Sequence, residues 1–326
     1  MATEIPVKLS DILRAHQRIA KCIHKTPVFT SSTANSITGR KLFFKAENLQ
    51  KTGSFKARGA LNSILSLKET KPSFTGVVTH SSGNHGQAVA WAAGVAGVPC
   101  AVVVPEYAPE VKKAAIRGYG AELATCGSQP SNRETVCQKV MAEKGYEFVS
   151  PYDHYDVIAG QGTIAVELLE QVPELDAILV PISGGGMSSG IAIAAKAIKP
   201  EIKVFLVEPE GKMMEKCLKT GERLWPNPPK YLDTIADGIR LQQAGNNTFP
   251  ILCQLAEKEV FTQTNEDMKE GMKFVFQRMK LVIEAASGAA VAAAFSQRLR
   301  DMDDNLRHIG VILCGGNTDI EMLPWY

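Results

Sequence analysis

A lysine set among small residues is the first feature of this chain that could do chemistry. Lys56 lies in QKTGSFKARGA, residues 50–60, where Gly53 and Ser54 leave room for a ligand to approach the amine. An amine presented in this way suits a Schiff base with a carbonyl compound. Most lysines are solvated surface residues, however, so this stretch read alone favours an ordinary surface lysine.

Two glycine-rich turns downstream reverse that balance, and the more specific is SGGGM at residues 183–187. Consecutive glycines let backbone N–H groups converge on an anion, and a helix N-terminus adds a favourable dipole. The pattern lacks the GK[ST] of a P-loop and the GxGxxG of a dinucleotide site, so it favours a phosphate cradle of another kind. The alternative is a turn whose glycines serve only close packing.

The second turn is SSGNHG, residues 81–86. Its adjacent hydroxyls and exposed amides can bind a carboxylate, and Asn84 can bond a cofactor hydroxyl. His85, a lone histidine at a helix start, is more often structural than catalytic. CGGN at 314–317 places a thiol at a strand end. This cysteine is as well explained by a small, buried, structural residue as by a chemical role. A reactive lysine, a phosphate cradle and a carboxylate-sized turn together describe pyridoxal phosphate holding an amino acid.

The elements that must position these residues are strands that alternate with helices along the chain. This alternation indicates parallel strand pairing in an α/β fold. Because the two glycine turns belong to separate strand–helix runs, we expect the site to lie between two domains. The expected strands are 41–45, 76–80, 100–104, 122–126, 146–149, 177–182, 204–209 and 310–314, and the expected helices are 9–22, 57–68, 87–96, 109–119, 133–144, 163–171, 187–198, 211–219, 265–278 and 286–299, with a loop at 222–233.

Net charge, cysteine spacing and the lengths of the apolar runs exclude several classes of protein and partner. A net charge of +2 with mixed signs gives no reason to expect nucleic acid or a membrane surface as a partner. The 7 cysteines form no CxxC pair, which argues for reduced thiols and against a zinc site or disulfide scaffold. Neither a secretory signal nor a run of about 18 apolar residues is visible, so we expect a soluble, cytoplasmic protein.

The order GSFKARGA, SSGNHGQA, SGGGM, VEP, IADG, CGGN resembles the fold-type II pyridoxal phosphate enzymes. Within them, KTGSFKARGALN, THSSGNHGQA, IAGQGT and RMKLVIE most resemble the eukaryotic serine racemase and serine/threonine dehydratase family, from His24 to Asn317. The resemblance implies a tryptophan synthase β-like fold, with two open α/β domains and the cofactor in the cleft between them. The large domain would comprise residues 1–66 and 154–326, with a small domain, residues 76–153, inserted in it.

The same resemblance implies roles for individual residues. Lys56 would carry the cofactor and act as a base on one face of the substrate, with Ser82 as the acid/base on the opposite face. Asn84 would bond the 3′ oxygen of the cofactor, and Cys314 would meet its pyridine nitrogen. The phosphate would be held by Ser183, Gly184, Gly185, Gly186 and Met187, and the substrate by Ser81, Ser82, His85 and Arg133.

A nucleotide site and a metal site also follow from the resemblance. ATP would act as an activator at the interface of a homodimer, bound by Ser31, Ser32, Lys51, Thr52, Gln87, Tyr119, Lys280 and Asn317. The family's Mg²⁺ or Mn²⁺ ion would be held by Glu208, but the next two ligand positions are Lys212 and Met214. A thioether cannot serve a hard cation, and an ammonium repels it, so we expect weak dependence on divalent ions. Glu210 and Glu215 are substitutes whose spacing is wrong.

The favoured hypothesis is therefore a serine racemase that also dehydrates serine, and threonine, to 2-oxo acid and ammonia. The main alternative is an enzyme that is chiefly an L-serine/L-threonine dehydratase. Leu241 stands where racemases often have serine, which bears on substrate preference. An aspartate racemase is less favoured, because the three-serine run associated with that activity is absent from residues 150–156. A non-catalytic ligand-binding protein would require Lys56 to be idle.

Overall fold

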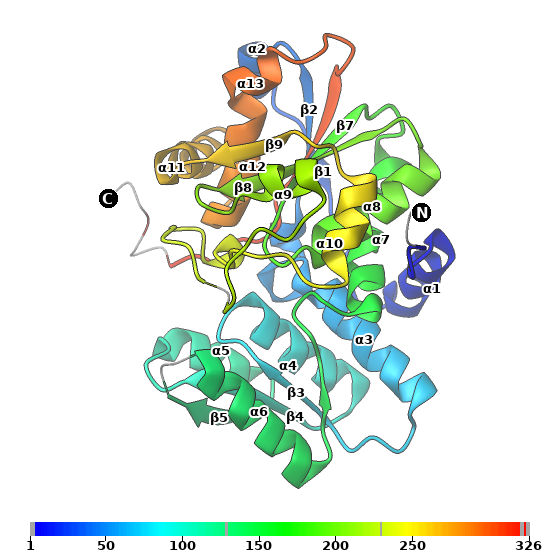
Figure 1. Cartoon of the computed structure of the whole chain (residues 1–326), viewed down its shortest axis with the longest axis vertical. Helices are drawn as coiled ribbons and strands as arrows, with labels where there is room; N and C mark the ends of the chain where they lie inside the picture. The colour runs from blue at the N-terminus through cyan, green and yellow to red at the C-terminus, as the bar shows by residue number, and fades with distance from the viewer. Residues whose placement is uncertain (1–3, 128–129, 229, 320–322, 324–326) are drawn as a thin grey trace.

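The chain builds two separate β-sheets. The computed structural model describes residues 4–127, 130–228, 230–319 and 323. A six-stranded sheet has the order β1-β2-β10-β7-β8-β9, and a four-stranded sheet has the order β5-β4-β3-β6. Figure 1 shows the larger sheet in the upper half of the molecule and the smaller sheet in the lower half. The expected domain boundaries remain a prediction.

The larger sheet is parallel except for β1, which pairs antiparallel with β2. Its central strands are apolar and buried, as expected of parallel strands covered on both faces. Its strands are β1 (Val28–Phe29), β2 (Lys41–Lys45), β7 (Ala177–Pro181), β8 (Lys203–Pro209), β9 (Val260–Gln263) and β10 (His308–Ile312). Around it lie α1 (Leu9–Ile19), α2 (Ser32–Thr38), α7 (Tyr155–Gln171), α8 (Gly186–Ile198), α9 (Met214–Thr220), α10 (Thr248–Leu255), α11 (Asn265–Phe274), α12 (Ala285–Phe295) and α13 (Gln297–Arg300).

The smaller sheet is parallel throughout. Its strands are β3 (Val77–His80), β4 (Cys100–Pro105), β5 (Glu122–Cys126) and β6 (Glu147–Phe148), and its helices are α4 (Asn84–Ala96), α5 (Glu110–Gly118) and α6 (Pro130–Lys144). The helix α3 (Lys56–Thr70) packs against both α4 and α7. It therefore joins the part of the chain built on the smaller sheet to the part built on the larger one.

Most expected elements are present with shifted ends, and four were not anticipated: β1, α2, α10 and β9. The expected helix 163–171 begins earlier, at Tyr155, because the glycines of IAGQGT are inside it. A Cβ at Gly160 would lie 2.7 Å from the Cα of Gly59, and one at Gly162 would lie 2.8 Å from the Gly190 carbonyl oxygen. These glycines therefore allow α3 and α8 to approach α7 closely, although their composition is typical of a loop.

Short helical segments complete the fold. Three are 3₁₀ turns, η1 (Glu47–Leu49), η2 (Lys51–Gly53) and η3 (Asp237–Ile239), and η4 (Val275–Met279) is a π-turn that ends α11. The expected helix 286–299 divides at Ser296, which is extended and caps α13 by accepting the N–H of Leu299.

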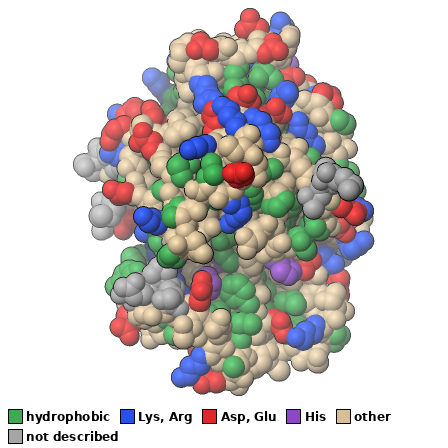
Figure 2. Space-filling model, in the orientation of Figure 1, with side chains coloured by type: hydrophobic (Ala, Val, Ile, Leu, Met, Phe, Trp, Pro, Cys, Tyr) green, Lys and Arg blue, Asp and Glu red, His purple; other side chains and the backbone are tan. Residues whose placement is uncertain are grey.

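In the part of the chain that the structure describes, no helix has the length and apolar character needed to cross a bilayer. Basic and acidic side chains are interspersed on the face seen in Figure 2.

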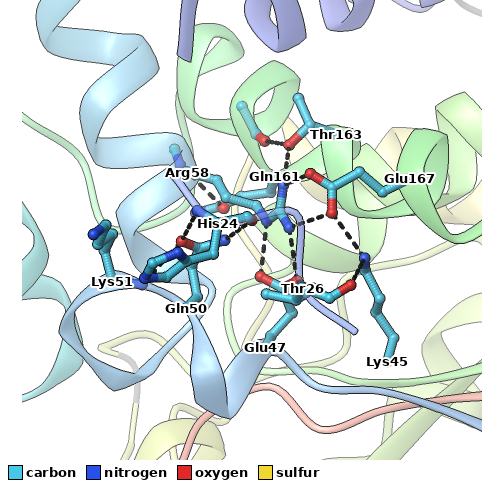
Figure 3. A network of polar contacts seen from close by, with 12 residues as sticks. His24, Thr26, Lys45, Glu47, Gln50, Lys51, Arg58, Gln161, Thr163 and Glu167 are labelled. Carbon is cyan, nitrogen blue, oxygen red and sulfur yellow. Dashed lines mark hydrogen bonds and ion pairs between the residues drawn. The ribbon is translucent and has the colours of Figure 1, made fainter. Parts of the chain in front are cut away.

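A buried ionic network holds the first turns of α3 in place (Figure 3). The guanidinium of Arg58 donates to Glu47 at 2.7 and 2.8 Å, to Glu167 at 2.7 and 2.8 Å, and to Thr163 at 3.1 Å. These bonds use all of its N–H donors. The ammonium of Lys45 donates to Glu167 at 2.7 Å, and the four ionised side chains are 0–2% exposed. Two cations and two carboxylates therefore balance inside the protein.

Replacing Arg58 with methionine is expected to cost about 3–5 kcal/mol of stability, because it leaves two buried carboxylates with one cation. Urea denaturation followed by fluorescence measures the change. Lys71→Met is the matched control, since Lys71 pairs with Glu147 at the surface with 54% of its side chain exposed, and it should cost less than about 1 kcal/mol. Equal losses in the two variants would contradict a balanced buried network.

Candidate active site

The stretch that carries Lys56 is fastened to the end of β10. The N–H of Phe55 donates to the Cys314 carbonyl at 3.0 Å, Ser54 forms a β-bridge with Gly315, and the Gly316 N–H donates to the Gly53 carbonyl at 2.9 Å. Lys56 is the first residue of α3, and its Nζ donates to the carbonyl of Pro151 at 2.5 Å. The structure thus brings together the lysine stretch and CGGN, which are more than 250 residues apart.

The Lys56 amine lies in an environment that favours its neutral form. Burial lowers its pKa to about 8, while the Cys314 thiol and the Glu284 carboxylate oppose this shift. An ordinary lysine has a pKa of about 10.4. A lowered pKa increases the fraction of the neutral amine, which is the nucleophile needed for a Schiff base.

The rate at which the cofactor-free protein forms a Schiff base with pyridoxal phosphate should therefore rise with pH up to about 8 and then level off. The sign follows from protonation, because the ammonium below the pKa has no lone pair for attack. Stopped-flow absorbance across a pH series measures this profile. A rate that still climbs about tenfold per pH unit above pH 9 would indicate an unperturbed lysine.

The loop 183–187 has the geometry of an anion cradle at the N-terminus of α8. Gly185 has φ +95°, and Cβ atoms at Gly184 and Gly186 would lie 2.3 Å from the Tyr152 ring and 2.7 Å from the Tyr152 carbonyl oxygen. The hydroxyl of Thr248 donates to the Gly184 carbonyl at 2.6 Å, which fixes the loop from α10. A side chain at any of the three glycines would displace Tyr152 or Thr248. The N–H groups of these glycines lie at the start of the helix.

Asn84 and Glu284 form a second wall of the site. The Asn84 amide donates to Glu284 at 2.8 Å, and its oxygen accepts from Asn317 at 2.9 Å. Burial raises the pKa of Glu284 to about 7, and the hydrogen bond from Asn84 opposes that shift. One N–H of the Asn84 amide has no partner within the described chain, so it can donate to a ligand oxygen.

The thiol of Cys314 lies in the same wall. Its sulfur is 3.5 Å from the Ser287 hydroxyl, and the Ser287 hydroxyl in turn donates to the Gly315 carbonyl at 2.8 Å. Burial and the Glu284 charge raise the pKa of Cys314 far above its usual range. The side chain is therefore a neutral thiol.

The turn 81–86 connects β3 to α4, and Ser82 is not the cap of that helix. The N-cap residue is Gly83, and the Ser81 hydroxyl accepts the Gly83 N–H at 3.3 Å. The half-buried Ser82 hydroxyl makes no hydrogen bond with any residue that the structure describes. Ser82 therefore has no capping role in this helix, and its hydroxyl is available to a ligand.

His85 lies beside Lys56 but is unsuited to hold a carboxylate through its ring. The ring is buried, and its Nε2 is 3.0 Å from the Val149 carbonyl oxygen, so Nε2 must carry the proton and donate. Burial, and then the charge of Lys56, lower its pKa to about 3, so the ring is neutral. Any contact of His85 with a substrate carboxylate would come from its backbone N–H.

Arg133 lies at the far side of this turn. Its charge acts on His80, the residue before Ser81, and its Nε is buried without a hydrogen-bond partner among the described residues. Its predicted role near the substrate stays a prediction. No hydrogen bond or ion pair within the described chain joins it to Ser81, Ser82 or Lys56.

The residues predicted to bind a nucleotide are only partly brought together. Asn317 donates to the Thr52 carbonyl at 2.7 Å, and Thr52 and Lys280 both have φ 60°. Ser31 caps α2 by accepting the Ala34 N–H, and Lys280 bonds the Gln277 carbonyl. Within the described chain, no hydrogen bond or ion pair links Ser31, Ser32, Gln87, Tyr119 or Lys280 to Thr52 or Asn317.

The residues at the proposed metal position do not suit a divalent ion, because Glu208 is already hydrogen-bonded by the protein. The buried Glu208 carboxylate accepts the Met214 N–H at 2.8 Å and the Thr262 hydroxyl at 3.1 Å. Glu215 accepts from Val260 at 3.1 Å and pairs with Arg298 at 2.9 Å, so it cannot substitute. The described residues include no cluster of three or more His, Cys, Asp or Glu side chains suited to a metal.

Three residues of the site were not predicted from the sequence. Glu284 ends the motif RMKLVIE, and an acidic residue in an apolar run was the available signal. Tyr152 covers Gly184, and burial raises its pKa to about 12. Asp237, on η3, accepts a hydrogen bond from Lys112 of α5 at 3.3 Å. The same carboxylate oxygen would lie 4.0 Å from a Cβ added at Gly83. The partners of Tyr152 and Asp237 are distant in the chain, so no local pattern marked these two residues.

These residues fit pyridoxal phosphate. The glycine loop supplies N–H groups where a phosphate would bind, and any side chain there would clash. Lys56 supplies an amine of lowered pKa, Asn84 a free amide N–H, and Cys314 a neutral thiol. Each group that the cofactor would require is present around one site.

Comparisons with known proteins agree with this reading. The family model described as pyridoxal-phosphate dependent enzyme matches residues 19–315. A solved structure described as a pyridoxal 5′-phosphate-dependent aspartate racemase is 58% identical, with a TM-score of 0.97, over 99% of this chain and 100% of that chain. The serine racemase of Dictyostelium discoideum is 47% identical over 97% of each chain. The L-threo-3-hydroxyaspartate ammonia-lyase of Saccharomyces cerevisiae is 41% identical over 95% of this chain and 93% of its own. The chain therefore belongs to the pyridoxal-phosphate dependent enzymes, within the racemase and ammonia-lyase branch that its motifs predicted.

Proposed function

We propose that the protein interconverts L- and D-serine and, as a side activity, dehydrates serine and threonine to the 2-oxo acid and ammonia. The observation that carries the proposal is an amine of lowered pKa, Lys56, in one site with a phosphate-sized glycine loop and an unpaired hydroxyl, Ser82. Similarity to serine racemase over 97% of both chains supports the substrate class.

Racemisation moves the α-proton of the substrate from one face to the other. Bound pyridoxal phosphate supplies the electron sink that makes this proton acidic. The backbone N–H groups of 184–187 would hold its phosphate, and Asn84 would orient its ring through the 3′ oxygen. Lys56 Nζ exchanges the proton on one face and Ser82 Oγ on the other, because one group cannot reach both faces of a clamped ring.

Dehydration starts with the same proton transfer. If the β-hydroxyl leaves before a proton returns to Cα, the products are the 2-oxo acid and ammonia. Lys56 alone suffices for this outcome from the enantiomer whose proton it faces. The ratio of racemisation to dehydration therefore depends on how quickly Ser82 delivers its proton.

The test is chiral chromatography of L-serine incubated with the holoenzyme, with pyruvate measured alongside. D-serine together with pyruvate is the expected result. Pyruvate without D-serine would make the protein a dehydratase only, and the absence of both products would refute the proposal.

Aspartate racemisation is the second candidate function, and one specific observation favours it. The solved aspartate racemase is 58% identical, compared with 47% for the Dictyostelium serine racemase. The half-buried Leu241 and the absent three-serine run at 150–156 do not decide between the two substrates. L-aspartate in a parallel assay does, since a kcat/KM for aspartate above that for serine would reassign the substrate.

We also propose that the protein is an ATP-activated homodimer. Leu49, Phe276 and Val282 are exposed apolar side chains, and Asn48 bonds the Val282 carbonyl at 3.1 Å. The polar atoms Asn48 Oδ1 and Thr52 Oγ1 are buried without partners in the described chain, as expected if a ligand or second subunit completes this region. Light scattering and serine turnover with and without ATP test the two parts separately.

A cytoplasmic location is the remaining proposal. All 7 cysteines of the chain are free thiols. Unpaired cysteines are typical of a reducing compartment. Fractionation of cells that produce the protein tests this assignment.

A further inference from the structure

Lys212 carries a fully buried ammonium group outside the catalytic site. It lies between β8 and α9 with 0% of its surface exposed. Its Nζ donates to the carbonyl of Leu241 at 2.5 Å and to that of Gln242 at 3.1 Å. Burial lowers the pKa of Lys212 to about 7, and the negative charge of Glu208 opposes that shift. An ammonium has three N–H donors, and the two loop carbonyls use two of them.

The two carbonyls belong to a loop that reaches the active site. We call residues 230–242 the 230–242 loop; its ends are joined by the Gln242 N–H to the Lys230 carbonyl at 3.1 Å and by the bridge Tyr231–Leu241. Its tip carries Asp237 and Gly238, and a Cβ at Gly238 would lie 3.0 Å from Glu284 Oε1. Lys212 thus fastens the base of a loop whose tip borders Glu284.

The atoms that a metal ion would use here are already engaged. The Lys212 carbonyl accepts the indole N–H of Trp225 at 2.6 Å, and both Glu208 oxygens accept hydrogen bonds. Met214 is 0% exposed in an apolar cluster with Leu218 and Trp225. The position therefore has a hydrogen-bonded occupant of its own.

We propose that the Lys212 amino group takes the place of a divalent ion: its hydrogen bonds hold the base of the 230–242 loop, near the charge of Glu208, and so keep the loop ordered without metal. Burying a lone carboxylate is costly, and the ammonium offsets that cost for Glu208. The ammonium also donates to two partly buried loop carbonyls, which would lose these hydrogen bonds without it. Its covalent attachment means that neither dilution nor a chelator can remove it.

The first test removes the ammonium. In Lys212→Met, hydrogen exchange of the 230–242 amides should accelerate at least about tenfold, because hydrogen bonds to a charged group are lost. Lys219→Met is the matched control, since Lys219 lies on α9 and pairs with Glu215 at the surface. Its loop amides should exchange at the wild-type rate. Equal exchange rates in the two variants would overturn the proposal.

The second test uses the thermal unfolding midpoint in EDTA and in MgCl2. The wild-type midpoint should be the same in both, and a saturable shift with Mg²⁺ would overturn the proposal without any variant being required. The double variant Lys212→Ala, Met214→Asp removes the lysine amine and places a carboxylate at the expected metal-ligand position. This variant should gain a saturable Mg²⁺-dependent rise in midpoint that EDTA reverses. A folded double variant with no response to Mg²⁺ would show that the ammonium does not replace an ion.

Discussion

Lys56→Ala is expected to lose covalent cofactor binding and at least about 10³-fold of turnover. The amine is the group that forms the Schiff base, and the same amine transfers the proton on one face of the substrate. Among the described residues around the site, His85 and Arg133 cannot replace it, because one has a pKa of about 3 and the other is a guanidinium. Visible absorbance and retained pyridoxal phosphate after dialysis measure the first loss, and serine turnover measures the second.

Lys25→Ala is the control for this variant, since Lys25 is 53% exposed and pairs with Glu170 far from the site. It should retain cofactor and activity. A Lys56→Ala protein that keeps both the visible band and wild-type turnover would remove the basis for the cofactor site and for the proposed activity.

Ser82→Ala should slow interconversion of the serine enantiomers by about 10²–10⁴-fold, the usual contribution of a positioned acid/base. The effect should be asymmetric. Dehydration of D-serine, whose α-proton faces Ser82 in the proposed arrangement, should fall with racemisation. Dehydration of L-serine should persist, because Lys56 faces that proton. Chiral analysis and pyruvate assays begun from each enantiomer measure the four rates.

Ser81→Ala is the matched control for Ser82. The Ser81 hydroxyl accepts the Gly83 N–H at 3.3 Å, so its loss should weaken the turn and affect both enantiomers alike. If Ser82→Ala racemised serine at nearly the wild-type rate, or slowed both dehydrations equally, the two-base assignment would be wrong.

The sequence predicted those parts of the site that depend on local pattern. Residues 183–187 must be glycine-rich because a side chain at Gly184 would enter the Tyr152 ring, and that requirement is visible in the letters. Lys56 was recognisable for the same reason, since small residues surround it in the chain. The strands that end at these turns were predictable from apolar runs, because parallel strands buried on both faces are apolar throughout.

The remaining parts depend on contacts between distant residues. Arg58 is two residues from Lys56, yet its partners Glu47 and Glu167 are 11 and 109 residues away. The pairing of Asn84 with Glu284 spans 200 residues. The helix α10 was missed because Pro250 lies in its first turn, where proline is tolerated but discourages a helix assignment.

At the metal position the sequence argued against a divalent ion but did not predict the arrangement of Lys212. Met214 and Lys212 argued against a divalent ion, and Lys212 was expected only to repel one. Lys212 Nζ donates hydrogen bonds to the carbonyls of Leu241 and Gln242 and feels the charge of Glu208. We therefore infer that the amino group takes the place of the ion. Its direction depends on the packing of the 230–242 loop, which no pattern around residue 212 encodes.

The most direct test of the proposed racemase starts reactions from L-serine and from D-serine in D₂O with the holoenzyme. Chiral separation followed by mass spectrometry reports the amount and the isotope content of each enantiomer. Two bases on opposite faces predict that the opposite enantiomer appears from either start and carries one deuterium at Cα, because the second base delivers a solvent-derived proton. Failure of the opposite enantiomer to appear from either start, or its appearance with the original hydrogen at Cα, would contradict the account.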